Sequence, residues 1–153
     1  MRRNDKRIDD PALIETIMRK ARVCRIALAD ANVPYVVPMN FGFRGNVIYL
    51  HSAREGRKLD ILSRNDLVCF EVDTDLEIVT GEAACSWGAK YYSVIGNGKA
   101  SIVTEPGEKR IALDAIMEKY SGKPEWDYGP AALDRVTVIR IDLTDISGKK
   151  SGR

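Results

Sequence analysis

Two segments of the chain have apolar residues at helical spacing. In the first, Asp10-Pro11 places an N-cap residue before a proline at the first helical position, which predicts a helix from there to about Lys20. Its apolar face is formed by Leu13, Ile14, Ile17 and Met18. The second helix is predicted over 106–120, because Gly122 and a following proline end the apolar pattern there. Shorter helical segments are predicted near 59–62 and over 130–135.

Between these helices the apolar residues alternate with polar ones, which is the pattern of half-buried strands. Strands are expected, in chain order, over 23–29, 33–43, 47–51, 67–72, 93–103 and 136–143, with weaker strand character over 76–79 and 83–87. Pro34 and Pro38 fall inside the second strand, and proline cannot donate to a strand ladder. That strand is therefore expected at a sheet edge, at a bulge or against a bound ligand.

Six or seven strands with hairpin connections and a few short helices indicate an α+β protein dominated by β structure, built as an antiparallel barrel. A length of 153 residues favours a single domain, 1–153. Residues 1–9 and 149–153, where basic side chains collect, are expected to be flexible tails.

Charge and cysteine content narrow the function. The 24 basic and 22 acidic residues leave a net charge of +2, which argues against nucleic acid as a partner. No apolar stretch reaches the ~20 residues of a membrane span, and no signal-like segment begins the chain. The cysteines are far apart and His51 is the sole histidine, so a metal site is not expected. A cytoplasmic location is expected from these features.

Residues 52–58 carry the clearest chemical signal. They combine the Ser52 hydroxyl, the flexible Gly56 and three cations, Arg54, Arg57 and Lys58, at the start of a predicted helix. A phosphate group needs backbone donors, a positive helix end and charged side chains, and this segment offers all three. The same composition also fits an ordinary solvated first turn. His51 directly before it is either a structural hydrogen-bonding residue or a catalytic one.

An aromatic cluster gives a second signal. Trp87, Tyr91 and Tyr92 lie close in sequence to Ser93 and to two glycines of the next strand. Core packing explains such a cluster, and so does stacking against a planar ring. Taken with the cationic segment, it suggests a ligand with a phosphate at one end and a flat ring at the other.

Three blocks carry a resemblance to one protein family: PYVVPMNFG at 34–42, YLHSAREGRK at 49–58 and YYSVIGNGKA at 91–100. They resemble signature blocks of the FMN-binding split-barrel proteins related to pyridoxamine 5′-phosphate oxidase, specifically the NimA-like 5-nitroimidazole resistance branch. The resemblance extends over roughly residues 10–149. It implies an antiparallel six-stranded FMN-binding split β-barrel with short flanking helices.

The resemblance also implies a homodimer with FMN sites at the subunit interface. By position, it implies that Pro38, Met39 and Asn40 line the flavin ring and that His51 lies near the ring or the substrate. The phosphate would be held within the segment formed by Ser52, Ala53, Gly56, Arg57 and Lys58. Trp87, Tyr91 and Ser93 would form a wall contributed by the partner chain.

The leading functional hypothesis is an FMN-dependent oxidoreductase that reduces small electrophiles such as nitro-aromatics, with His51 as the candidate catalytic residue. One alternative is a non-catalytic flavin-binding electron carrier or sensor. Another keeps the barrel but exchanges the ligand for haem or a deazaflavin.

Overall fold

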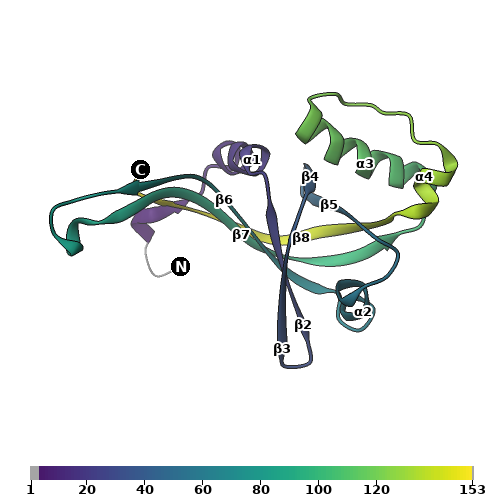
Figure 1. Cartoon of the computed structure of the whole chain (residues 1–153), viewed down its shortest axis with the longest axis horizontal. Helices are drawn as coiled ribbons and strands as arrows, with labels where there is room; N and C mark the ends of the chain where they lie inside the picture. The colour runs from purple at the N-terminus through teal and green to yellow at the C-terminus, as the bar shows by residue number, and fades with distance from the viewer. Residues whose placement is uncertain (1–3, 153) are drawn as a thin grey trace.

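The computed structural model describes residues 4–152 and shows one antiparallel sheet that rolls into a split barrel (Figure 1). The strand order is β3-β2-β6-β7-β8-β5-β4, and the short β1 pairs with β8. The strands are β1 (Arg7–Ile8), β2 (Cys24–Asp30), β3 (Val33–Met39), β4 (Phe41–Arg44), β5 (Val47–Ser52), β6 (Leu67–Val79), β7 (Gly88–Val103) and β8 (Thr137–Ser151). The predicted β-dominated α+β class is confirmed.

The helices begin and end where local chemistry predicts. They are α1 (Pro11–Lys20), α2 (Arg57–Leu62), α3 (Pro106–Ser121) and α4 (Pro130–Arg135), with short 3₁₀ turns η1 (Asn4–Lys6) and η2 (Ala84–Ser86). The Asp10 carboxylate accepts a hydrogen bond of 3.0 Å from the amide of Ala12, as an N-cap does. Gly122, in the left-handed region at φ 74°, ends α3.

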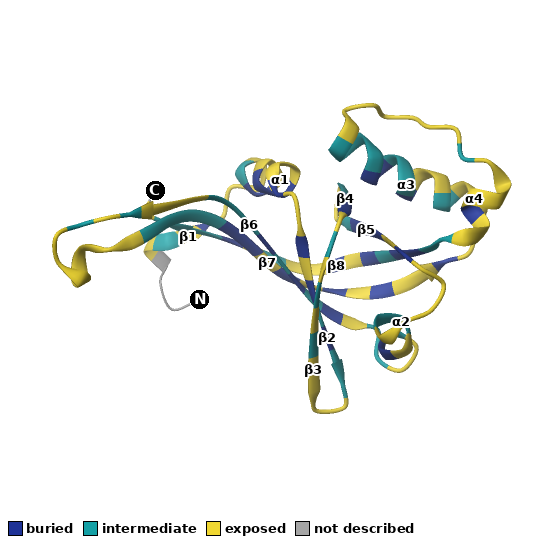
Figure 2. Cartoon of the chain, in the orientation of Figure 1, coloured by how far each residue is buried: buried dark blue, intermediate teal, exposed yellow. Residues whose placement is uncertain are grey.

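The barrel has an apolar interior and a second apolar layer outside it. Along β5, Ile48 and Leu50 belong to the interior core, whereas Tyr49 between them packs against α3 on the outer face. This alternation follows from the two-residue period of a strand. Gly42 of β4 allows α3 to approach closely, because a Cβ atom there would lie 2.6 Å from the carbonyl carbon of Ala115. Figure 2 shows the buried segments of α3, whose Ala112, Ala115 and Ile116 cluster with Tyr49 of β5.

The predicted strand over 33–43 is two strands. It breaks at Asn40, which separates β3 from β4, and the chain then crosses from one edge of the sheet to the other. Among the described strands β3 pairs only with β2, so Pro34 and Pro38 lie on a sheet edge, one of the expected placements.

The hairpin of β6 and β7 is longer than its hydrophobic pattern predicts. Both strands continue past the barrel and form an arm, drawn at the left of Figure 1. The strand predicted over 83–87 is wrong. That segment is the turn η2, in which the Ser86 hydroxyl donates to the carbonyl of Ala83 at 2.6 Å and accepts from its amide at 3.2 Å.

Much of the sequence predicted as tails takes part in the sheet. Arg7 pairs with Lys149 and Ile8 with Gly148, and β8 continues to Ser151. Ile8 is buried, so the pairing of these two segments covers core surface. Residues 1–3 and 153 of the predicted tails lie outside the described residues.

Candidate functional site

The end of β5 holds a buried polar atom with no partner. Ser52 is on the same inward face of β5 as Ile48 and Leu50, and it is only 6% exposed. Within residues 4–152, no hydrogen-bonding partner reaches its Oγ atom. A buried hydroxyl left unsatisfied costs ~1–3 kcal/mol, so such a group calls for an explanation such as a ligand atom or an ordered water.

Gly56 shapes the loop between Ser52 and α2. Its φ of 135° and ψ of 161° lie in a region open essentially only to glycine, and the space around a Cβ position there is free of other atoms. Its carbonyl accepts from the amide of Leu59 at 2.9 Å, which starts α2. The glycine is therefore required by the backbone path and not by a close neighbour.

Three cations surround this loop. Arg54 and Arg57 are exposed and Lys58 is half-buried. The guanidinium of Arg57 lies 4.7 Å from the centroid of the Tyr35 ring on β3. The loop therefore combines the unsatisfied Ser52 hydroxyl, a glycine with open space on its outer side and three positively charged side chains. This combination is a suitable environment for a phosphate group.

A cavity of about 320 Å³ opens between α2 and the neighbouring strands. It is lined by Arg54, Leu59, Leu62, Ser63, Ala100, Ser101, Ile102 and Thr137. Thr137 pairs with Ser52 in the ladder between β5 and β8, so the cavity lies at the strand ends that carry the orphan hydroxyl.

Sequence reasoning missed most of this lining. Ser101 and Thr137 belong to strands that look like ordinary barrel strands, and only the strand register places them beside the loop over 52–58. The sequence marks Arg54 as one of the three cations of that loop, but it does not indicate that Arg54 lines a cavity.

One of the residues predicted to line a flavin ring, Asn40, lies close to His51. Phe41 pairs with Leu50, which places Asn40 and His51 next to each other at the ends of β4 and β5. Pro38 and Asn40 are exposed, and Met39 packs partly against the core. His51 is exposed and is on the same outer face of β5 as Tyr49. Its imidazole therefore lies on the opposite face of β5 from the Ser52 hydroxyl.

The predicted wall residues lie at the far end of β7. Val103 pairs with Val138, and Val138 in turn pairs with His51, whereas Tyr91 precedes Val103 by 12 positions along the same strand. At a rise of ~3.3 Å per residue, Tyr91 lies about 40 Å along β7 from Val103, the residue of β7 that is in line with His51. Trp87 on the arm is 56% exposed, and Ser93 is buried. A single chain therefore does not bring these residues to the loop at 52–58.

The cysteines behave as apolar residues where they are buried. Cys24 is fully buried, and burial, together with the charge of Glu71, raises the pKa of its thiol to about 12. Burial also raises the pKa of Cys69. Among the described residues, no group of three or more histidine, cysteine or acidic side chains is placed to hold a metal ion.

Comparison with known proteins identifies the family. The family model described as pyridoxamine 5′-phosphate oxidase matches residues 10–150. A candidate 5-nitroimidazole antibiotic resistance protein from Bacteroides thetaiotaomicron is 34% identical, with 94% of this chain and 86% of that chain covered and a TM-score of 0.84. The chain therefore belongs to the pyridoxamine 5′-phosphate oxidase family and has its split-barrel fold.

More distant structures share the fold. An FAD- and haem-binding protein from Mycobacterium smegmatis is 17% identical, with 97% of this chain and 74% of that chain covered and a TM-score of 0.85. An FAD-binding protein from Mesorhizobium loti is 22% identical, with coverages of 94% and 96% and a TM-score of 0.68.

No curated protein matches the chain in sequence. In residues 4–152, no helix combines the length and the apolar character needed to cross a membrane.

Proposed function

We propose that this protein binds FMN at the interface of a homodimer and reduces small electrophiles such as nitro-aromatics. The observation that carries the proposal is the Ser52 hydroxyl, which is buried and has no hydrogen-bonding partner among the described residues. Arg54, Arg57 and Lys58 follow it within six residues. Family membership supports a flavin, and the 34% identical Bacteroides protein is a candidate 5-nitroimidazole antibiotic resistance protein.

The phosphate would be bound within the loop over 52–58. The Ser52 hydroxyl would donate to a phosphate oxygen, and Arg57 and Lys58 would add charge-assisted hydrogen bonds. The backbone around Gly56 is open to a ligand on its outer side, since nothing lies within 4 Å of a Cβ position there. These residues fit the phosphate end of FMN.

The ring would lie along Pro38, Met39 and Asn40, beside His51. The second wall needs another copy of the chain, because Trp87 and Tyr91 lie far along β7 from this end of the barrel. The arm that carries Trp87 also exposes Leu76 and Ile78, at 65% and 59%. Exposed apolar side chains gathered on one element favour a contact with a partner, and we propose a second copy as that partner.

A bound flavin would supply the transfer of electrons to the substrate. The chain's own part would be to anchor the phosphate, orient the ring through the backbone at 38–40 and exclude water with the partner's aromatic wall. The exposed imidazole of His51, next to Asn40, would hold a proton near the substrate.

Titration with FMN, FAD and riboflavin tests the cofactor, because riboflavin has the ring but no phosphate. We expect the protein to bind FMN more tightly than riboflavin. The double variant Arg57→Ala/Lys58→Ala should lose at least about 100-fold in FMN affinity, since each charge-assisted hydrogen bond is worth ~1.5–3 kcal/mol, and should bind riboflavin unchanged.

The matched control is Arg22→Ala/Lys123→Ala, which also removes two positive charges but on the α1 and α3 side of the molecule. It should leave both affinities unchanged. A protein that binds no flavin would refute the proposal. Equal FMN affinity in the double variant and the wild type would show that the phosphate lies elsewhere.

Turnover separates an enzyme from a carrier or sensor. We expect the reduced, FMN-loaded protein to reduce a 5-nitroimidazole faster than free reduced FMN does, and His51→Gln to slow this reaction while FMN affinity is kept. If the protein reacts no faster than free flavin, the carrier alternative replaces the enzyme.

A further inference from the structure

The structure points to the β2–β3 hairpin as the element that keeps Arg57 available for an anionic ligand. We infer that Tyr35 holds the Arg57 guanidinium in place. We also infer that Arg64 pairs with the Asp30 carboxylate, which would otherwise pair with Arg57. Tyr35, Asp30 and Arg64 are thus positioning residues for the phosphate site. This inference rests on the proposed function, because it assigns the partners that make Arg57 a phosphate ligand.

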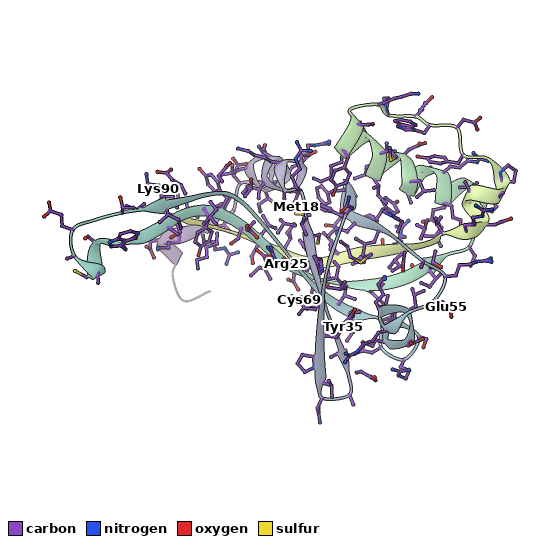
Figure 3. The ribbon with its side chains drawn as sticks, viewed as in Figure 1. Met18, Arg25, Tyr35, Glu55, Cys69 and Lys90 are labelled. Atoms are coloured by element: carbon purple, nitrogen blue, oxygen red, sulfur yellow. The ribbon has the colours of Figure 1, made fainter. Side chains whose placement is uncertain are left out.

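Tyr35 provides the first contact. It lies on β3, on the side of the hairpin that faces α2 (Figure 3), and its ring centroid is 4.7 Å from the Arg57 Cζ atom. The ring is half-buried and packs against the barrel core, so it is a fixed platform, whereas Arg57 is exposed. A cation stacked on a fixed ring samples fewer conformations and therefore loses less conformational entropy when it binds an anion.

Arg64 provides the second contact, at the other end of α2. It donates to both carboxylate oxygens of Asp30, from Nε at 3.2 Å and from Nη2 at 2.7 Å. Next to it, the Asn65 side chain donates to the carbonyl of Ala29 at 3.0 Å. These bonds fasten the segment after α2 to the end of β2 and occupy both oxygens of Asp30.

Asp30 lies within electrostatic range of Arg57. Hydrogen bonds from Arg64 lower the pKa of the Asp30 carboxyl, and the positive charges of Arg64 and Arg57 lower it further. The carboxylate is therefore ionised at neutral pH and attracts both arginines. As long as Arg64 holds it in a bidentate pair, Arg57 remains on Tyr35 and is available to an anionic ligand.

A charge-neutralisation series tests the role of Arg64. In Arg64→Gln the Asp30 carboxylate loses its partner and competes with phosphate for Arg57. We expect FMN affinity to fall about two- to fivefold, the size of an exposed ion pair, with riboflavin affinity unchanged. In Asp30→Asn/Arg64→Gln the competing charge is gone as well, and we expect FMN affinity to return to the wild-type value.

The double variant separates the inference from a simple structural role. Both variants lack the Asp30–Arg64 ion pair, so if that pair only stiffened the loop, both would bind FMN weakly. Recovery in the double variant supports competition by Asp30, and equal weakness of the two variants would overturn it.

Two substitutions at Tyr35 test the ring platform. Tyr35→Phe keeps the aromatic face and should keep the wild-type ratio of FMN to riboflavin affinity, whereas Tyr35→Leu should lower that ratio about two- to fivefold. In the flavin-free protein, the NMR shifts of the Arg57 side chain should move in Tyr35→Leu and not in Tyr35→Phe.

Different results would overturn the proposed function and the positioning role. A wild-type protein without flavin affinity refutes the proposed function. A wild-type protein that prefers FMN over riboflavin, together with Arg64→Gln and Tyr35→Leu variants that keep this preference, would overturn the positioning role alone.

Discussion

The hydroxyl of Tyr120, near the end of α3, accepts a hydrogen bond of 3.1 Å from the backbone amide of Phe41. It also donates to the carbonyl of Arg22 at 2.8 Å. Phe41 directly follows Asn40, where β3 ends and β4 begins. One side chain of α3 thus fixes the strand break that ends the segment proposed to line the ring.

Replacing Tyr120 by Phe removes both hydrogen bonds and leaves the Phe41 amide without this partner. We expect the free energy of unfolding to fall by about 1–3 kcal/mol, measured by urea denaturation. Tyr91→Phe is the matched control, because its ring contact with Lys149 remains, and it should change stability by less than about 0.5 kcal/mol. An unaffected Tyr120→Phe variant would show that water replaces the hydroxyl without cost.

The neighbouring Lys119 makes the stability of the protein vary with pH in the alkaline range. Its ammonium donates to the carbonyls of Met18 and Arg19 at 2.6 and 2.8 Å and lies 4.2 Å from the centroid of the Phe41 ring. Burial, helped by the charge of Arg22, lowers its pKa from 10.5 to about 8.

Between pH 8 and 10.5 the unfolded chain therefore binds more protons at Lys119 than the folded chain does, so this group makes stability rise with pH over that window. The stability gained is complete above pH 10.5 and is lost as pH falls through 8. Lys119→Met should lack this contribution. We expect the stability difference, wild type minus variant, to increase from pH 8 to 10.5 in denaturation experiments, and a constant difference would contradict the lowered pKa.

Gly42 is required by the packing of β4 against α3. A Cβ atom there would lie 2.6 Å from the carbonyl carbon of Ala115 and 2.7 Å from the nitrogen of Ile116, and helix backbone cannot move aside cheaply. We expect Gly42→Ala to destabilise the protein by about 1–3 kcal/mol. Gly129→Ala, with nothing within 4 Å of the new atom, is the control and should lie within about 0.5 kcal/mol of wild type.

Gly56 is required by its backbone angles instead. Because φ is 135° and the surrounding space is open, Gly56→Ala should cost about 1–3 kcal/mol in stability through strain alone. Gly45→Asn is the comparison, since φ at Gly45 is 58°, a left-handed angle that asparagine tolerates. A larger loss at Gly45 than at Gly56 would contradict this explanation.

Ser52 should show opposite effects on stability and on binding. Ser52→Ala removes a buried hydroxyl that has no partner in the described part of the chain, so the flavin-free protein should be more stable by about 1 kcal/mol or more, in calorimetry or urea denaturation. The same variant should bind FMN more weakly and riboflavin equally well. Reduced stability in the absence of flavin would show that the hydroxyl already has a partner, such as an ordered water.

The local features of the fold could be predicted from sequence. The N-cap at Asp10, the end of α3 at Gly122 and the inward alternation of Ile48 and Leu50 all depend on residues a few positions apart. Short-range hydrogen bonding and the period of a strand determine such features, and both are visible in the sequence. The cationic loop at 52–58 is also contiguous, so its chemistry could be recognised directly.

The strand break at Asn40, the length of the arm and the cavity beside Ser52 were decided by tertiary structure. The strand break depends on the hydrogen bond between Tyr120 and the amide of Phe41, and the cavity depends on the pairing of Thr137 with Ser52. The length of the arm depends on how far the pairing of β6 with β7 continues, as far as Val79 with Gly88. Hydrophobic periodicity shows which face of a strand is buried, but it does not show the strand's partner or register. For the same physical reason, only the folded chain reveals that Trp87 and Tyr91 lie too far from Ser52 to share a site within one subunit.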